Sequence, residues 1–61
     1  MTEMDKLIEL NFLRLSFLKK INQLSLQQWI DLAAELNVAK NDREGAASKL
    51  AKQELKKRGT L

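Results

Sequence analysis

Large apolar side chains recur along residues 7–24 at helical spacing, but they fall on two faces of a helix. One continuous row, at intervals of three or four residues, consists of Leu10, Leu13, Phe17, Ile21 and Leu24. A second row, well around the helix, consists of Ile8, Phe12 and Leu15, with Leu7 and Leu18 filling in. A surface helix of a monomer needs one apolar stripe. The pattern therefore predicts that this helix is covered on more than one side.

Candidate helix caps divide the chain into three helices. Thr2, Ser25 and Asn41 each precede an acid or amide by three positions, in TEMD, SLQQ and NDRE, the spacing of a capping box. They predict helices at about 3–23, 26–36 and 42–58. With no Pro and only two Gly, nothing in the sequence favours strands and turns. The predicted fold class is all-α, in a single domain that covers residues 1–61.

The sequence allows two positions for the end of the predicted 26–36 helix. Residues 35–44, ELNVAKNDRE, contain neither Gly nor Pro, so the helix from residue 26 could continue into the basic segment with Gly45 in its interior. Asn37 is the candidate left-handed terminator if the helix ends there. Gly59 is the candidate stop of the last helix.

The apolar pattern favours a homodimer. A domain of about 60 residues has a marginal core, and the predicted 26–36 helix, which can fold back on the first helix, is too short and alanine-rich to cover both rows. We therefore expect a short helical hairpin or three-helix chain that forms an intertwined homodimeric bundle. The expected interface residues are Leu10, Leu13, Phe17, Ile21, Leu24, Leu26, Trp29, Ile30 and Leu36.

The alternative is a monomeric three-helix fold in which the first helix is central. The predicted 42–58 helix disfavours this arrangement, because its apolar residues are mostly alanines and only Leu50 and Leu55 are large.

The net charge of +3 arises in the second half of the chain. Its main contributors are the cations of the last predicted helix, Lys49, Lys52, Lys56, Lys57 and Arg58. Such a cluster can attract nucleic acid, or it can be a solvated helix end whose cations complement the helix dipole. No aromatic residue lies among them to stack on bases. We expect weak, non-specific attraction to nucleic acid at most.

The residues that carry most catalytic and metal chemistry are missing. The chain has no His and no Cys, so neither a disulfide nor a zinc site is expected. Neither an activated nucleophile nor a glycine-rich phosphate loop is present, and we expect no enzymatic activity and no cofactor. The acidic start MTEMDKL is unlike a signal peptide, and no apolar run is long enough to span a bilayer. These features predict a cytoplasmic protein that does not associate with membranes.

Residues 24–44, LSLQQWIDLAAELNVAKNDRE, resemble the dimerising segment of the histone-like nucleoid-structuring family. The similarity lies in Ser25-Leu26-Gln27, then Leu32, Leu36 and Val38, then Asn41 and Arg43. Upstream, FLRLSFLKKINQL is similar to that family's short N-terminal helices. The resemblance implies an N-terminal oligomerisation region in which short helices fold back on a long helix that continues past Asn41.

Two departures limit what the resemblance implies. The family's DNA-reading module, with its Trp-Thr-Gly and Gly-Arg-x-Pro loop, does not occur in these 61 residues, and a basic segment replaces the family's acidic linker helix. The expectation is an oligomerisation fragment or a truncated, nucleoid-associated relative that can also associate with a full-length related protein.

Two functional hypotheses result from the sequence. The leading one is a homodimerising module of a nucleoid-associated or gene-regulatory protein, acting by protein–protein contact. The alternative is a small dimeric helical regulator that binds RNA or DNA through its basic C-terminal helix.

Overall fold

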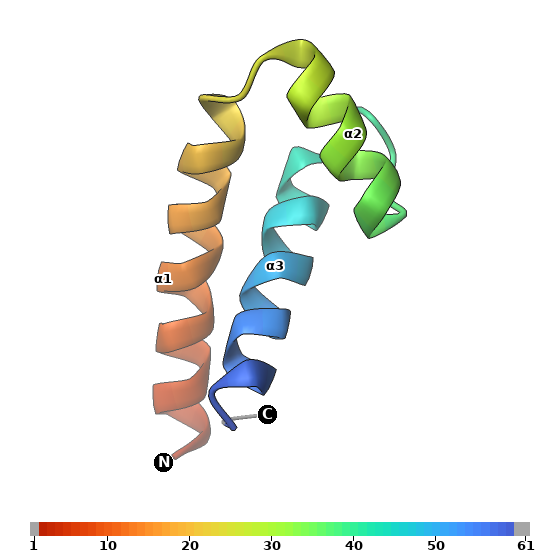
Figure 1. Ribbon diagram of the computed structural model, residues 1–61. Helices are drawn as coiled ribbons and strands as arrows, with labels where there is room; N and C mark the ends of the chain where they lie inside the picture. The colour runs from red at the N-terminus through yellow and green to blue at the C-terminus, as the bar shows by residue number, and fades with distance from the viewer. Residues whose placement is uncertain (1, 60–61) are drawn as a thin grey trace.

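The structure is a computed structural model that describes residues 2–59. It contains three α-helices, α1 (Glu3–Asn22), α2 (Leu26–Leu36) and α3 (Arg43–Lys57), and the described residues form no strand. Helices α1 and α3 lie side by side and antiparallel, and α2 lies beside the opposite end of this pair from the chain termini (Figure 1). The predicted all-α fold class is confirmed, and each helix begins and ends within one residue of the position expected from the caps.

The first two helices begin at the capping boxes that the sequence predicts. The Thr2 hydroxyl accepts a hydrogen bond from the Asp5 amide at 3.1 Å, and the Ser25 hydroxyl accepts one from the Gln28 amide at 3.2 Å. In return, the Asp5 and Gln28 side chains accept from the amides of Thr2 and Ser25. These contacts satisfy backbone donors that have no partner within the helix.

Helix α2 ends at Leu36, so a helix that is continuous through residue 41 is wrong for this chain. Asn37 adopts the left-handed conformation with φ 57°, and the amides of Asn37 and Val38 donate to the carbonyls of Ala34 and Ala33. Asparagine tolerates this conformation better than most residues. The chain therefore turns at Asn37 and starts a separate helix.

The cap of α3 differs by one residue from the predicted one. Asp42, rather than Asn41, is the N-cap, and its carboxylate accepts a hydrogen bond from the Gly45 amide at 2.9 Å. A Cβ at Gly45 would lie 2.6 Å from the Asp42 Cγ, so the glycine leaves room for this cap. At the other end, Gly59 has φ 78° just after α3 stops, as the sequence predicts.

The core lies between α1 and α3 and extends under α2. Ala46, Ala47 and Ala51 are fully buried, together with Leu55. Trp29 of α2 is 1% exposed, and its indole N–H donates to the Lys40 carbonyl at 2.7 Å. The core cluster consists of Ile21, Trp29, Ala33, Ala46 and Ala47, with Phe17, Leu18, Leu24, Leu32, Leu36, Val38 and Leu50 packed against it.

Helix α3 covers one apolar row of α1, although Leu50 and Leu55 are the only large apolar residues of α3. Helix α3 packs along α1, whereas α2 packs mainly against α3 (Figure 1). Alanine side chains let two helix backbones approach closely, so a helix with few large residues can still exclude water from its partner's apolar row. Helix α1 does not lie at the centre of the three helices, because one of its faces remains exposed to solvent.

Replacement of Ala47 by leucine tests this close packing. We expect Ala47→Leu to lower the free energy of unfolding by about 1–3 kcal/mol, because added methylenes in a filled core force the helices apart. Ala34→Leu is the control, since Ala34 is exposed on α2, and its effect should stay within about 0.5 kcal/mol. Urea unfolding followed by circular dichroism, at one protein concentration, measures both. Equal stabilities for the two variants would contradict the packing of α3 on α1.

Candidate association surface

Most of the residues that the sequence assigns to a dimer interface are in contact within the single chain. Ile21 and Trp29 are buried, and Phe17, Leu24 and Leu36 pack against the same core. Leu10, Leu13 and Ile30 are partly buried, and Leu26, which is 68% exposed, is the only exposed member of the set. Their role in a dimer stays a prediction. The chain already buries much of this surface by packing α3 against α1.

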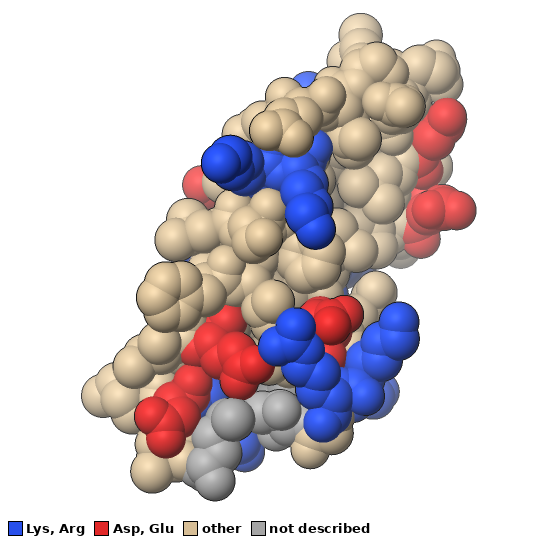
Figure 2. Space-filling model, turned by 60° about the vertical axis from the view of Figure 1, so that its left-hand side comes forward, with Lys and Arg blue, Asp and Glu red and all other residues tan. Residues whose placement is uncertain are grey.

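The apolar surface that remains open lies on the other side of α1. We call it the outer face, and its residues are Met4 at 66% exposure, Leu7 at 55%, Ile8 at 47%, Phe12 at 69% and Leu15 at 54%. Ile8, Phe12 and Leu15 are the second row of the sequence pattern, and Met4 extends it by one turn. Figure 2 turns the α1 side of the molecule forward and shows uncharged surface running between groups of charged side chains.

Spacing alone could have identified the outer face as apolar, but it could not show that this row is the uncovered one. Both rows on α1 have the periodicity of a buried stripe. The choice between them depends on which side of α1 meets α3. In the structure α3 takes the side of Phe17 and Ile21, and Phe12 is left in solvent.

Two basic side chains in the first half of α3 bind carbonyls at the ends of the other helices. Arg43 donates to the Ile21 carbonyl at 3.3 Å, and its guanidinium lies 5.1 Å from the centre of the Trp29 ring. Lys49 donates to the Leu36 carbonyl at 2.8 Å. Carbonyls in the last turn of a helix have no helical partner and carry partial negative charge. These cations therefore stabilise the helix ends as well as connecting the helices.

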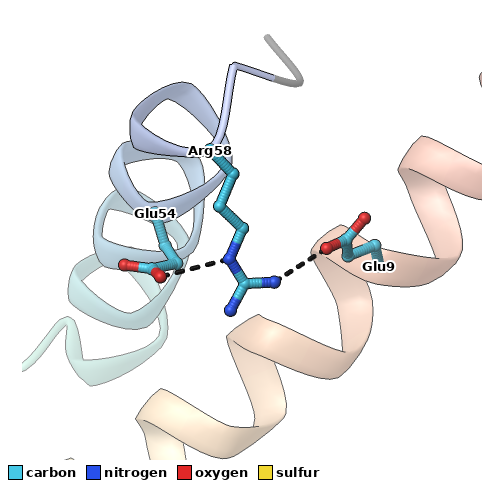
Figure 3. A network of polar contacts seen from close by, with 3 residues as sticks. All are labelled: Glu9, Glu54 and Arg58. Atoms are coloured by element: carbon cyan, nitrogen blue, oxygen red, sulfur yellow. Dashed lines mark hydrogen bonds and ion pairs between the residues drawn. The ribbon is translucent and has the colours of Figure 1, made fainter.

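Arg58, at the C-terminal end of α3, connects that end to the first half of α1, as Figure 3 shows. Its Nη1 lies 2.8 Å from Glu9 of α1, and its Nε lies 3.2 Å from Glu54 of α3. The Arg58 side chain is 49% exposed, so solvent screens both ion pairs, and such pairs contribute little to stability individually.

The predicted nucleic-acid patch is therefore only partly available. Of its five cations, Lys49 and Arg58 have partners within the chain. Lys52, Lys56 and Lys57 are exposed on α3, and none of them forms an ion pair with another residue in the 2–59 range. This leaves three of the five cations of the predicted patch for an external anion.

The described residues offer no other site. Asp5 is the partner of Thr2 in the capping box of α1, and Asp42 is the N-cap of α3. Between residues 2 and 59 there is neither a group of three metal-ligating side chains nor a pocket, and no helix in that range could cross a membrane.

Comparison with known proteins finds no matching protein family, no matching curated protein and no matching solved structure. The resemblance to the histone-like nucleoid-structuring family thus stays a prediction from residues 12–44. One structural implication of that resemblance is wrong here, because the helix that should continue past Asn41 ends at Leu36.

Loss of the Arg58 contacts should loosen the paired ends of α1 and α3. We expect Arg58→Gln to lower the free energy of unfolding by less than about 1 kcal/mol and to speed amide hydrogen exchange near Glu9, since local opening is easier where fewer contacts hold the helices. Lys57→Gln removes the same charge from a side chain with no ion pair among residues 2–59, and it should leave that exchange unchanged. The same exchange rates in both variants would show that Arg58 does not hold α1.

Proposed function

We propose that this chain is a homodimerising helical association module that acts by protein–protein contact through the outer face of α1. The observation that supports the proposal is the row of five large apolar side chains, each 47–69% exposed on one helix face. Single exposed apolar residues are ordinary on protein surfaces, but a contiguous group marks an interaction surface. Its exclusion from water would yield roughly 25 cal/mol for each Å² of apolar area.

A second copy is the occupant that best matches this face. Helix α1 has 20 residues and a length of about 30 Å. Its outer face, from Met4 to Leu15, occupies about half of that length, and the same row on a second chain offers equal length and apolar character. Dimers with twofold symmetry use one surface twice. The dimer we propose joins two folded chains side by side instead of intertwining them, because α3 already covers the row that intertwined chains would exchange.

For the biological role we propose gene regulation, which rests on the resemblance to the histone-like nucleoid-structuring family. A module of this kind acts by pairing, either with itself or with a longer related protein that presents a similar helix. The role implies a cytoplasmic, nucleoid-associated location.

Phe12→Asp tests the outer face directly. Phe12 is 69% exposed in the folded chain, so we expect the variant to keep its helices. In a dimer the new carboxylate would be buried without a partner, which is costly, so we expect the variant to sediment as a monomer where the wild-type protein sediments as a dimer. Sedimentation equilibrium with circular dichroism measures mass and helicity together.

Gln53→Asp is the matched control, because it adds the same charge at an exposed position of α3, and it should remain dimeric. A wild-type protein that stays monomeric at every soluble concentration would exclude the proposal. So would a Phe12→Asp variant that dimerises as tightly as the wild type.

Direct nucleic-acid binding is the second candidate function, and the observation that favours it is the exposure of Lys52, Lys56 and Lys57 on α3. A dimer would carry two such clusters. A protein that neutralises phosphates releases counterions, so its affinity falls steeply as salt increases. With three such lysines on α3 and no aromatic residue in that helix, we expect weak binding that does not depend on sequence.

Replacement of these three lysines by glutamine separates the two functions. The triple variant should remain a dimer, and any retention on nucleic acid should fall uniformly across sequences, because phosphate contacts carry no base information. Fluorescence anisotropy with RNA and DNA oligonucleotides at several salt concentrations measures this. Tight binding of one particular sequence at physiological salt, abolished in the triple variant, would favour direct nucleic-acid binding over association.

A further inference from the structure

Charges along α1 are separated by sign. The first part of the helix carries Glu3, Asp5 and Glu9 against a single cation, Lys6. Residues 10–22 contain no acid and carry Arg14, Lys19 and Lys20. The outer face extends from Met4 to Leu15, so it overlaps the acidic part and the start of the basic part, which includes Arg14, while Lys19 and Lys20 follow its last residue.

Few of these charges on α1 are neutralised by ion pairs within the described residues. Lys19 and Lys20 are exposed, and no ion pair joins them or Arg14 to another residue of the 2–59 range. At the acidic end Arg58 pairs with Glu9, and Lys6 lies 3.9 Å from Glu3, whose side chain is 91% exposed. In Figure 2 a group of acidic side chains lies at the lower left of the surface, with basic side chains above it.

We propose that two α1 helices pair in antiparallel orientation across the outer face, with the acidic half of each beside the basic half of the other. The inference rests on the proposed function, since it assigns an orientation to that dimer. Parallel pairing would bury the same apolar row but would set acids beside acids and cations beside cations. Exposed ion pairs are individually weak. Because the two orientations bury equal apolar area, these ion pairs are the difference between them and select the orientation. Electrostatic complementarity acts in this way at interfaces.

Distances along the helix make the two orientations distinguishable. Met4 and Leu15 lie near the two ends of the outer face, about 16 Å apart along the axis at 1.5 Å per residue. Full overlap of two antiparallel rows places Met4 of one copy opposite Leu15 of the other and keeps the two Met4 residues about 16 Å apart. Parallel pairing instead places like residues opposite each other. A disulfide requires Cα atoms within about 7 Å, so it reports which residues are opposite.

The test uses Met4→Cys and Leu15→Cys, each a single cysteine in a chain that otherwise has none. Cysteine is itself a small apolar residue, and neither substitution changes a charge. The two variants are mixed, allowed to exchange and oxidised gently, and the disulfide-linked pairs are identified by intact mass. We expect the mixed Met4→Cys/Leu15→Cys disulfide to exceed the two like-with-like disulfides taken together, because random pairing of equal amounts would make the mixed product equal to their sum. Lys52→Cys, on exposed α3, measures linkage by random collision.

The possible failures are distinct. Predominant like-with-like disulfides would overturn the antiparallel orientation and leave the proposed dimer intact. Statistical amounts of all three products, no faster than for Lys52→Cys and with monomeric mass in sedimentation, would overturn the dimer and the orientation together. Circular dichroism of each cysteine variant confirms that the helices remain, so that a loss of linkage reports on association.

Discussion

The close contact between the alanine-rich face of α3 and one side of α1 determines the rest of this structure. Ala46, Ala47 and Ala51 have no exposed surface, Ala46 and Ala47 belong to the same core cluster as Ile21 of α1, and the backbones of α1 and α3 lie close together. This contact selects the row of α1 that is excluded from water and leaves the opposite row open. The candidate function depends on that selection, because the surface available to a partner is what α3 does not cover.

The basic residues illustrate how tertiary contacts change the meaning of a charge cluster. Five cations in the last part of the sequence resemble a binding patch for anions. In the folded chain Lys49 binds a carbonyl at the end of α2, and Arg58 bridges Glu9 and Glu54. Cations that hold helix ends are poorly available to phosphates, and the remaining lysines lie in a helix whose sequence contains no aromatic residue. Association through α1 is therefore the stronger hypothesis for this molecule.

Local chemistry predicted the helices well. Thr2, Ser25 and Asn37 act through hydrogen bonds or backbone preferences within a few residues, so their effect is visible in the sequence. The one-residue error at the start of α3 has a local cause too, since Asn41 and Asp42 are both good caps and only the carboxylate of Asp42 reaches the Gly45 amide. The candidate site was harder to predict, because Phe12 and Phe17 belong to rows of similar spacing and apolar character.

The sequence by itself determined the all-α class, the positions of the three helices and the presence of two apolar rows on α1, because capping and periodicity depend on residues that are close in the chain. Only the tertiary structure decided that α3 rather than α2 covers α1, that Phe17 faces the core and Phe12 the solvent, and that Arg58 reaches Glu9. These outcomes depend on the packing of segments that are distant in sequence. In that packing, small alanine side chains let two helix backbones come close together and exclude water from the contact.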